Sequence, residues 1–161
     1  MDALCNVHVK LLACDLVALS PNAAEQSAVS RVGWTPCRAE SVGVVVLRDL
    51  KPGKFLRFVV DDGTGCVPCV LWLNQLTSPY FLKRNPSGVR LAAEVSRKMA
   101  SQVQLGVVAR VRGRVTGYRG KVQITVSDVV LEGDPNAQVL HWLDCIRLGR
   151  KCYGKLCRKG V

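Results

Sequence analysis

Apolar and polar residues alternate most regularly between residues 107 and 126. Successive side chains of a strand point to opposite faces, so an alternation of period two predicts a strand with one apolar and one polar face. Three arginines occupy alternate positions on the polar face: Arg110, Arg112 and Arg114. Gly117 and Gly120 then predict a hairpin turn around Tyr118, and a second alternating strand begins at Lys121.

Apolar runs and turn residues predict the other regular elements. Valine-rich runs predict three earlier strands, at residues 41–48, 54–61 and 66–73. Gly43 is expected to mark a bend or a bulge in the first of these strands. Apolar spacings of three and four residues predict helices at 89–103 and 136–148, and Asp134 is suited to cap the second helix.

The segments around these elements have less regular patterns. The apolar stretch at residues 7–19 is expected to be a strand or a strand followed by a turn. Polar residues predict a loop at 20–40, and prolines and a glycine predict an irregular segment at 74–90.

This order of elements is that of an OB-fold, with five strands and a helix between the third and fourth strands. The predicted fold is therefore mainly β, a five-stranded OB-fold barrel with an inter-strand helix and a C-terminal helix. Such a barrel binds oligonucleotides on its second and third strands, between the loop joining strands one and two and the loop joining strands four and five. We expect an OB-fold domain with an N-terminal strand extension at 1–135, a helix at 136–150 and a basic tail at 151–161.

The charge of the chain is strongly basic and uneven. The 161 residues carry a net charge of +11, and residues 41–131 alone hold fourteen basic and five acidic side chains. This excess favours a polyanionic partner such as nucleic acid, or an acidic protein surface. No apolar run is long enough to predict a membrane span, and the N-terminus lacks the pattern of a signal peptide.

Eight cysteines are present, and their spacing is poor for a metal site. Cys66 and Cys69 form a C-x-x-C pair that enters an apolar strand, and Cys152 and Cys157 are spaced more widely. Reduced thiols are therefore favoured over a zinc site or a disulfide framework. No metal and no cofactor is expected.

Three stretches together resemble one known family. The stretches are FVVDDGTGCVPCVLWLN, RVRGRVTGYRGKVQI and DPNAQVLHWLDC. They are similar to the Stn-one subunit of the CST telomere-capping complex, in its short plant-type form, and the resemblance runs from residue 8 to about residue 152. It implies an OB barrel whose C-terminal helix packs against a Ten-type small OB-fold subunit. It also implies a Ctc-type large subunit, protection of single-stranded telomeric DNA in the nucleus, and fill-in of the C-strand by DNA polymerase alpha–primase.

Aromatic and basic residues of the predicted binding face are the candidates for contact with DNA. Aromatic side chains stack on bases, and lysine and arginine neutralise phosphates. The candidates are Lys51, Lys54, Phe55, Arg57, Trp72, Tyr118, Arg119 and Lys121. Tyr118, at a loop tip, is the best stacking candidate, and Phe55 and Arg57 share the surface face of their strand. Phe58 is expected in the core, and Trp72 fits the core better than a surface platform.

Two further groups of residues each allow more than one interpretation. The three alternating arginines of the fourth strand should either form a solvated outer face or serve the DNA backbone or an acidic protein partner. An apolar stripe on the last helix should either cover the chain's own barrel or dock a partner helix, and the resemblance favours the partner. The stripe is Val139, Trp142, Leu143 and Ile146.

The sequence does not favour an enzyme. Phosphate-binding loops, nucleophile elbows and zinc-protease motifs are absent from it. Asp61 and Asp62 are expected to cap backbone amides of a turn, and His141 is expected to be structural. The rival functions are a general single-strand binder like the middle subunit of replication protein A, and an assembly adaptor that touches no DNA.

Overall fold

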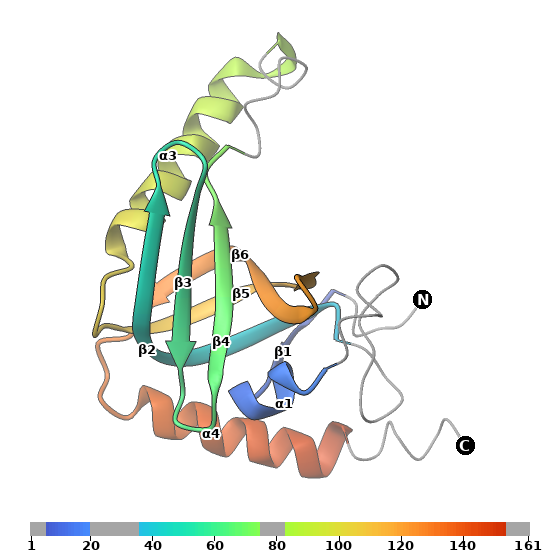
Figure 1. The fold of residues 1–161 in the computed structure, drawn as a ribbon. Coiled ribbons are helices and arrows are strands. Elements are labelled where there is room, and N and C mark those ends of the chain that lie inside the picture. The colour runs from blue at the N-terminus through green and yellow to red at the C-terminus, as the bar shows by residue number, and fades with distance from the viewer. Residues whose placement is uncertain (1–5, 20–35, 75–82, 154–161) are drawn as a thin grey trace.

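Six strands among the described residues form one sheet, which closes into a barrel (Figure 1). The computed structural model describes residues 6–19, 36–74 and 83–153. Most of the expected polar loop, the middle of the expected irregular segment and the end of the basic tail with Cys157 lie outside these residues. The strands are β1 His8–Lys10, β2 Arg38–Lys51, β3 Phe55–Asp61, β4 Cys66–Trp72, β5 Val108–Tyr118 and β6 Lys121–Leu131.

The barrel closes because one long strand pairs at both ends. The sheet order is β1-β2-β3-β4-β6-β5, and β2 also pairs with β5. The first half of β2 lies antiparallel to β5 and the second half antiparallel to β3, while β4 and β6 pair in parallel. Strands β2 to β6 thus form the five-stranded OB-fold barrel that the sequence predicts, and β1 adds a strand parallel to β2.

Strand β2 bends where it passes from one neighbour to the other (Figure 1). A Cβ atom at Gly43 would lie 2.4 Å from the backbone oxygen of Asp61, so only glycine allows the two strands to approach this closely. The register shift of β2 lies between Val45 and Leu47, two residues beyond the glycine. The predicted irregularity is therefore present, with its bulge slightly later in the chain.

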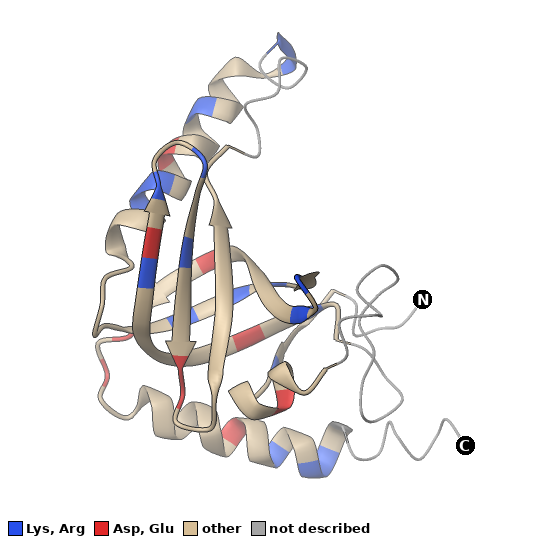
Figure 2. Ribbon diagram, viewed as in Figure 1, with Lys and Arg blue, Asp and Glu red and all other residues tan. Residues whose placement is uncertain are grey.

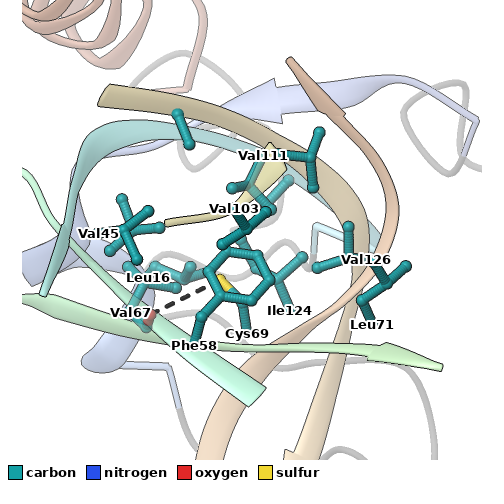
Figure 3. Close-up of a cluster of buried hydrophobic side chains, with 14 of the residues drawn as sticks. Leu16, Val45, Phe58, Val67, Cys69, Leu71, Val103, Val111, Ile124 and Val126 are labelled. Atoms are coloured by element: carbon teal, nitrogen blue, oxygen red, sulfur yellow. Dashed lines mark hydrogen bonds between the residues drawn. The ribbon is translucent and has the colours of Figure 1, made fainter. Parts of the chain in front are cut away.

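Alternate side chains of all five barrel strands fill the interior. Figure 3 shows this core, in which Phe58 is 1% exposed, as predicted. The other labelled strand residues are Val45, Val67, Cys69, Leu71, Val111, Ile124 and Val126. Leu16 and Val103 close the core from outside the sheet. Leu16 belongs to the short helix α1 (Ala13–Val17), which follows β1 where the sequence predicted a strand or strand and turn.

Helix α3 (Pro86–Gln102) projects from the barrel (Figure 1). It begins three residues before the predicted start, because the Asn85 side chain accepts a hydrogen bond from the Gly88 N–H at 3.0 Å and Pro86 suits the first turn. Its final turn packs on the barrel, whereas Leu91 and Val95 are 64% and 49% exposed. The predicted apolar spacing therefore gives a helix here but not a core-facing one.

Helix α4 (Ala137–Leu148) lies across the end of the barrel that holds the β3–β4 turn and continues into the π-helical segment η2 (Gly149–Tyr153) (Figure 1). Asp134 lies before the helix rather than at its cap, which is Asn136. The Asp134 carboxylate accepts the Asn136 N–H at 2.8 Å, so it stabilises the entry turn instead. None of the described helices has the length and apolar character that crossing a membrane requires.

Candidate nucleic-acid and partner interfaces

Aromatic side chains of β3 and β4 meet on the outer face of the barrel. Phe55 and Trp72 are paired across the two strands, and their ring centroids are 5.6 Å apart in an edge-to-face arrangement. The interior positions of β4 go to Leu71 and Cys69, so Trp72 lies outside and is only partly buried. The expectation that Trp72 is a core residue is wrong, and its indole is placed where a base can stack.

Arg57 joins this aromatic pair to the β5–β6 hairpin. Its guanidinium carbon lies 4.8 Å from the Phe55 ring centroid and 4.5 Å from the Tyr118 ring centroid. The guanidinium carbon of Arg119 lies 5.2 Å from the Tyr118 centroid on the hairpin. These five side chains, Trp72, Phe55, Arg57, Tyr118 and Arg119, form what we call the aromatic–arginine row. A hydrogen bond from Arg57 lowers the pKa of the Tyr118 phenol; burial opposes this effect, and the charges of Arg119 and Arg57 add to it.

The hairpin tip has an unusual residue in its turn. Arg119 and Gly120 have φ angles of +50° and +73° between the paired residues Tyr118 and Lys121, which is the two-residue type I′ geometry. Among the described residues other than glycine, Arg119 alone has a positive φ. Asparagine, aspartate or glycine usually occupies this position, because other side chains crowd the backbone there. A long cation is therefore kept at the tip against the local backbone preference.

Exposed lysines extend the row at both ends. Lys51 and Lys54 flank the β2–β3 turn beside Phe55, and the Lys51 ammonium lies 3.6 Å from the Asp49 carboxylate. Lys121 is exposed at the start of β6, next to the hairpin tip. All eight residues expected to contact DNA thus lie along one path from the β2–β3 turn to the β5–β6 hairpin.

Two adjoining hollows continue this path past the hairpin. Their volumes are about 450 Å³ and 270 Å³, and both are lined by Pro68, Lys121 and Val122. The larger hollow reaches Cys66 and Val17. The sequence does not predict this part of the surface, because it is formed where the hairpin and α1 come close to β4, and no local pattern records that approach.

Two of the three alternating arginines are neutralised within the chain. Arg110 contacts Glu40 and Glu132 at 2.5 Å each, and Arg112 contacts Glu40 at 2.6 Å. Burial would raise the pKa of Glu40, but hydrogen bonds from Arg112 and Arg110 lower it below its usual value. Arg110 and Arg112 therefore have acidic partners within the chain, and of the three arginines Arg114 remains the best candidate for DNA or a protein partner. Arg114 is exposed and is not part of this network.

Helix α4 is fixed to the barrel by one face. Ala137, His141 and Cys145 are buried on that face, and the Cys145 sulfur lies 3.3 Å from Nε2 of His141. Lys10 of β1 contacts Asp144 at 2.5 Å. His141, 2% exposed and inaccessible to a substrate, has the structural role that the sequence predicted.

The opposite face of α4 is apolar and open to solvent. Val139, Leu143 and Ile146 are 60%, 57% and 41% exposed, so the interpretation that this stripe covers the chain's own barrel is wrong for them. Trp142 is 37% exposed, and its Nε1 donates a hydrogen bond to the Asp62 backbone oxygen at 2.9 Å. Trp142 therefore ties α4 to the β3–β4 turn while its ring borders the open stripe. Leu140, 54% exposed, is a neighbour of the stripe that sequence analysis left out.

The two adjacent carboxylates of the β3–β4 turn have structural partners. Asp61 accepts the Gly63 N–H at 2.7 Å, and Asp62 accepts the Thr64 N–H and the Ala13 N–H at 2.8 Å each. The expected capping role is thus confirmed, and Asp62 also anchors α1. In the described part of the chain, no group of three or more His, Cys, Asp or Glu side chains could hold a metal ion.

Comparisons with known proteins show which family and which solved structures the chain is similar to. Residues 41–132 match the family described as OB-fold nucleic acid binding domain. The chain is 52% identical over 149 residues to the CST complex subunit STN1 of Arabidopsis thaliana, and the match covers 92% of both chains. It superposes on a chain of the S. pombe Stn1-ten1 complex with a TM-score of 0.69 and 16% identity, covering 95% of this chain and 98% of that chain. It superposes on a chain of a replication protein A heterotrimer bound to ssDNA with a TM-score of 0.67 and 15% identity, covering 91% and 98%. At these identities the two structures show a shared fold.

Proposed function

Because the chain belongs to the family of STN1 subunits of the CST complex and has an OB-fold nucleic-acid-binding domain, we propose that it is a non-catalytic subunit that binds single-stranded telomeric DNA on the aromatic–arginine row. The observation that carries the proposal is the position of Arg57 between the rings of Phe55 and Tyr118. Aromatic rings alternate there with cations, which is the arrangement that holds stacked bases and their phosphates together.

The row explains binding without sequence-specific contacts. Every base has a face that can stack, so Trp72, Phe55 and Tyr118 accept any base. Stacking of one base on an aromatic ring is worth about 1–3 kcal/mol, which is roughly a 5- to 150-fold change in affinity. The cations along the path neutralise phosphates and make the affinity depend on salt.

The test compares wild type with Tyr118→Ala and Phe55→Ala in the assembled complex, with Arg90→Ala on the projecting helix α3 as the control. Affinity for a single-stranded oligonucleotide should fall at least about fivefold for each row variant. Arg90→Ala should leave the affinity unchanged. Full affinity in both row variants would mean that the chain is an assembly adaptor whose basic surface meets protein.

The open face of α4 supports the second part of the proposal, which is docking of a Ten-type small OB-fold subunit. An apolar face that remains outside the core is the usual contact for a partner helix. The S. pombe structure that shares the fold is itself a Stn1-ten1 complex. In this proposal residues 1–135 are the DNA-binding unit, residues 136–150 are the docking element, and residues 151–161 are a basic tail.

The mass of the chain with a co-expressed Ten-type subunit, measured by light scattering, tests this docking. Leu143→Asp and Ile146→Asp should abolish a one-to-one complex, because they place a carboxylate in the apolar contact. Leu91→Asp on α3, equally apolar and exposed, is the matched control and should preserve the complex. A monomer that ignores the partner would favour a general single-strand binder like the middle subunit of replication protein A.

The wider role follows from the same family membership. We propose that the chain acts in the nucleus at telomeres, in a trimer with a Ctc-type large subunit. There it would support chromosome-end protection and C-strand fill-in by DNA polymerase alpha–primase. Loss of telomeric C-strand synthesis in cells that carry Ile146→Asp, with normal amounts of the protein, is the expected result.

A further inference from the structure

Two arginines that do not belong to the aromatic–arginine row are paired directly on neighbouring strands of the barrel. The register pairs Arg38 of β2 with Arg114 of β5, and His8 of β1 with Arg38. Directly opposite residues of antiparallel strands have Cα atoms about 4.5–5.5 Å apart, so the two arginine side chains leave the sheet next to each other. Figure 2 shows the basic start of β2 beside the β5–β6 hairpin.

Arg38 and Arg114 differ from the earlier arginines of β5 in having no acidic partner among the described residues. One step along the ladder, Arg112 faces Glu40 and is neutralised by it. For Arg38 and Arg114, by contrast, no acidic side chain lies within 4.0 Å in the part of the chain that the structure describes. Like charges directly opposite each other destabilise a sheet, so an anion that binds between the two arginines would relieve their repulsion.

The pair is continuous with the aromatic–arginine row. Arg114 precedes Tyr118 by four residues on the same strand, and both have even positions on its outer face. At about 3.3 Å per residue, Tyr118 and Arg114 are roughly 13 Å apart along β5. Phosphates of a stacked strand are about 3.4 Å apart, and an extended strand roughly doubles that spacing, so the interval corresponds to about two to four nucleotides.

We propose that Arg38 and Arg114 bind backbone phosphates of the single strand that leaves the aromatic–arginine row, so that the DNA path turns round the rim of the barrel at the β5–β6 hairpin. This inference rests on the proposed function. The guanidinium fork donates two parallel hydrogen bonds to a phosphate, and two adjacent forks offer four. DNA fits better than an acidic protein, because the residues paired directly with Arg38 and Arg114 are His8 and Thr125, and neither offers an apolar side chain for the core of a protein interface.

The length dependence of binding tests the inference. The double variant Arg38→Ala, Arg114→Ala is compared with wild type in the assembled complex. The ligands are a series of oligothymidines that starts at the shortest length that wild type binds and increases in steps of two nucleotides. Arg90→Ala is the control. For the shortest oligonucleotide, the affinity of the double variant should be within about twofold of the affinity of wild type. Oligonucleotides at least four nucleotides longer should lose roughly fivefold or more in affinity, and their salt slope should decrease by about 1.4, for two lost contacts at about 0.7 each.

Three results would overturn the inference. An equal loss of affinity at every oligonucleotide length would mean that the pair acts only through the overall electrostatic field of the barrel. Unchanged binding at every length, with weakened assembly, would assign the pair to an acidic protein. A lower melting temperature of the double variant would mean that the pair has a structural role, because removing facing like charges should raise it slightly. Failure of the proposed function is distinguishable, because Tyr118→Ala would then bind even the shortest oligonucleotide normally.

Discussion

Replacing Arg119 with asparagine should make the protein more stable and a weaker DNA binder. Arg119 has a φ of +50° in a two-residue turn. The left-handed conformation costs an ordinary residue roughly 1–2 kcal/mol, whereas asparagine tolerates it and Asn-Gly is a preferred type I′ pair. Loss of the contact with the Tyr118 ring offsets part of the gain. We therefore expect the free energy of unfolding to rise by about 0.5 kcal/mol, which is a melting temperature higher by roughly 1–2 °C.

The same substitution should remove one phosphate contact. The slope of log affinity against log salt should decrease by about 0.7, and the affinity at low salt should fall accordingly. Urea unfolding and salt-dependent oligonucleotide binding measure the two effects on the same preparation. Arg119→Lys is the matched control, since it keeps both the charge and the crowded backbone, and it should change neither quantity much. A less stable Arg119→Asn would refute the reasoning about the turn, and an unchanged salt slope would refute the phosphate contact.

Three other substitutions test the interior contacts. Glu40→Gln should lower the free energy of unfolding in urea by about 2–3 kcal/mol, because it leaves two partly buried arginines without their shared anion. Asp49→Asn on the surface is the control and should change the free energy of unfolding little. Burial lowers the pKa of His141, with the charge of Glu40 opposing, so the unfolded state takes up a proton first as the pH falls below about 6.5. The melting temperature should therefore fall between pH 7.5 and 5.5 in wild type and fall less in His141→Asn; an identical fall would exclude His141 as the cause. Trp142→Phe should lower the free energy of unfolding in urea by about 1 kcal/mol, because the hydrogen bond to the Asp62 backbone oxygen is lost. The variant should still form the complex with the Ten-type subunit. Loss of that complex would show that the indole N–H serves the partner.

The sequence predicted the barrel well because its signals are local. Alternation from residue 107, and the glycines at 117 and 120, define the hairpin without reference to any other part of the chain. The same holds for the outward-facing positions of Phe55 and Arg57, since the other face of β3 carries only the apolar residues Leu56, Phe58 and Val60 and is the buried one. Strand β4 does not alternate, and its apolar residues on both faces led to the wrong prediction that Trp72 lies in the core.

What the sequence could not reveal depends on contacts between distant residues. Glu40 contacts Arg110 and Arg112, which lie 70 and 72 residues away in the sequence. No spacing rule relates residues so far apart. The exposed stripe of α3 has the periodicity of a core-facing helix, because periodicity records a face and not what lies against it. The early start of α3, in contrast, was readable from Asn85 followed by Pro86.

The double pairing of β2 has a consequence for folding during synthesis. Its first half pairs with β5, and Ala39 and Gly113 are partners although 74 positions separate them. At about 5–20 residues per second, the ribosome needs roughly 4–15 s to make the missing strand after Ala39 has been added. Strands β2, β3 and β4 can form a meander in that time, but the first half of β2 has an open edge and Glu40 has no cation. Closure therefore comes last, and the slow, non-local step of folding is the arrival of the strand that leads into the β5–β6 hairpin.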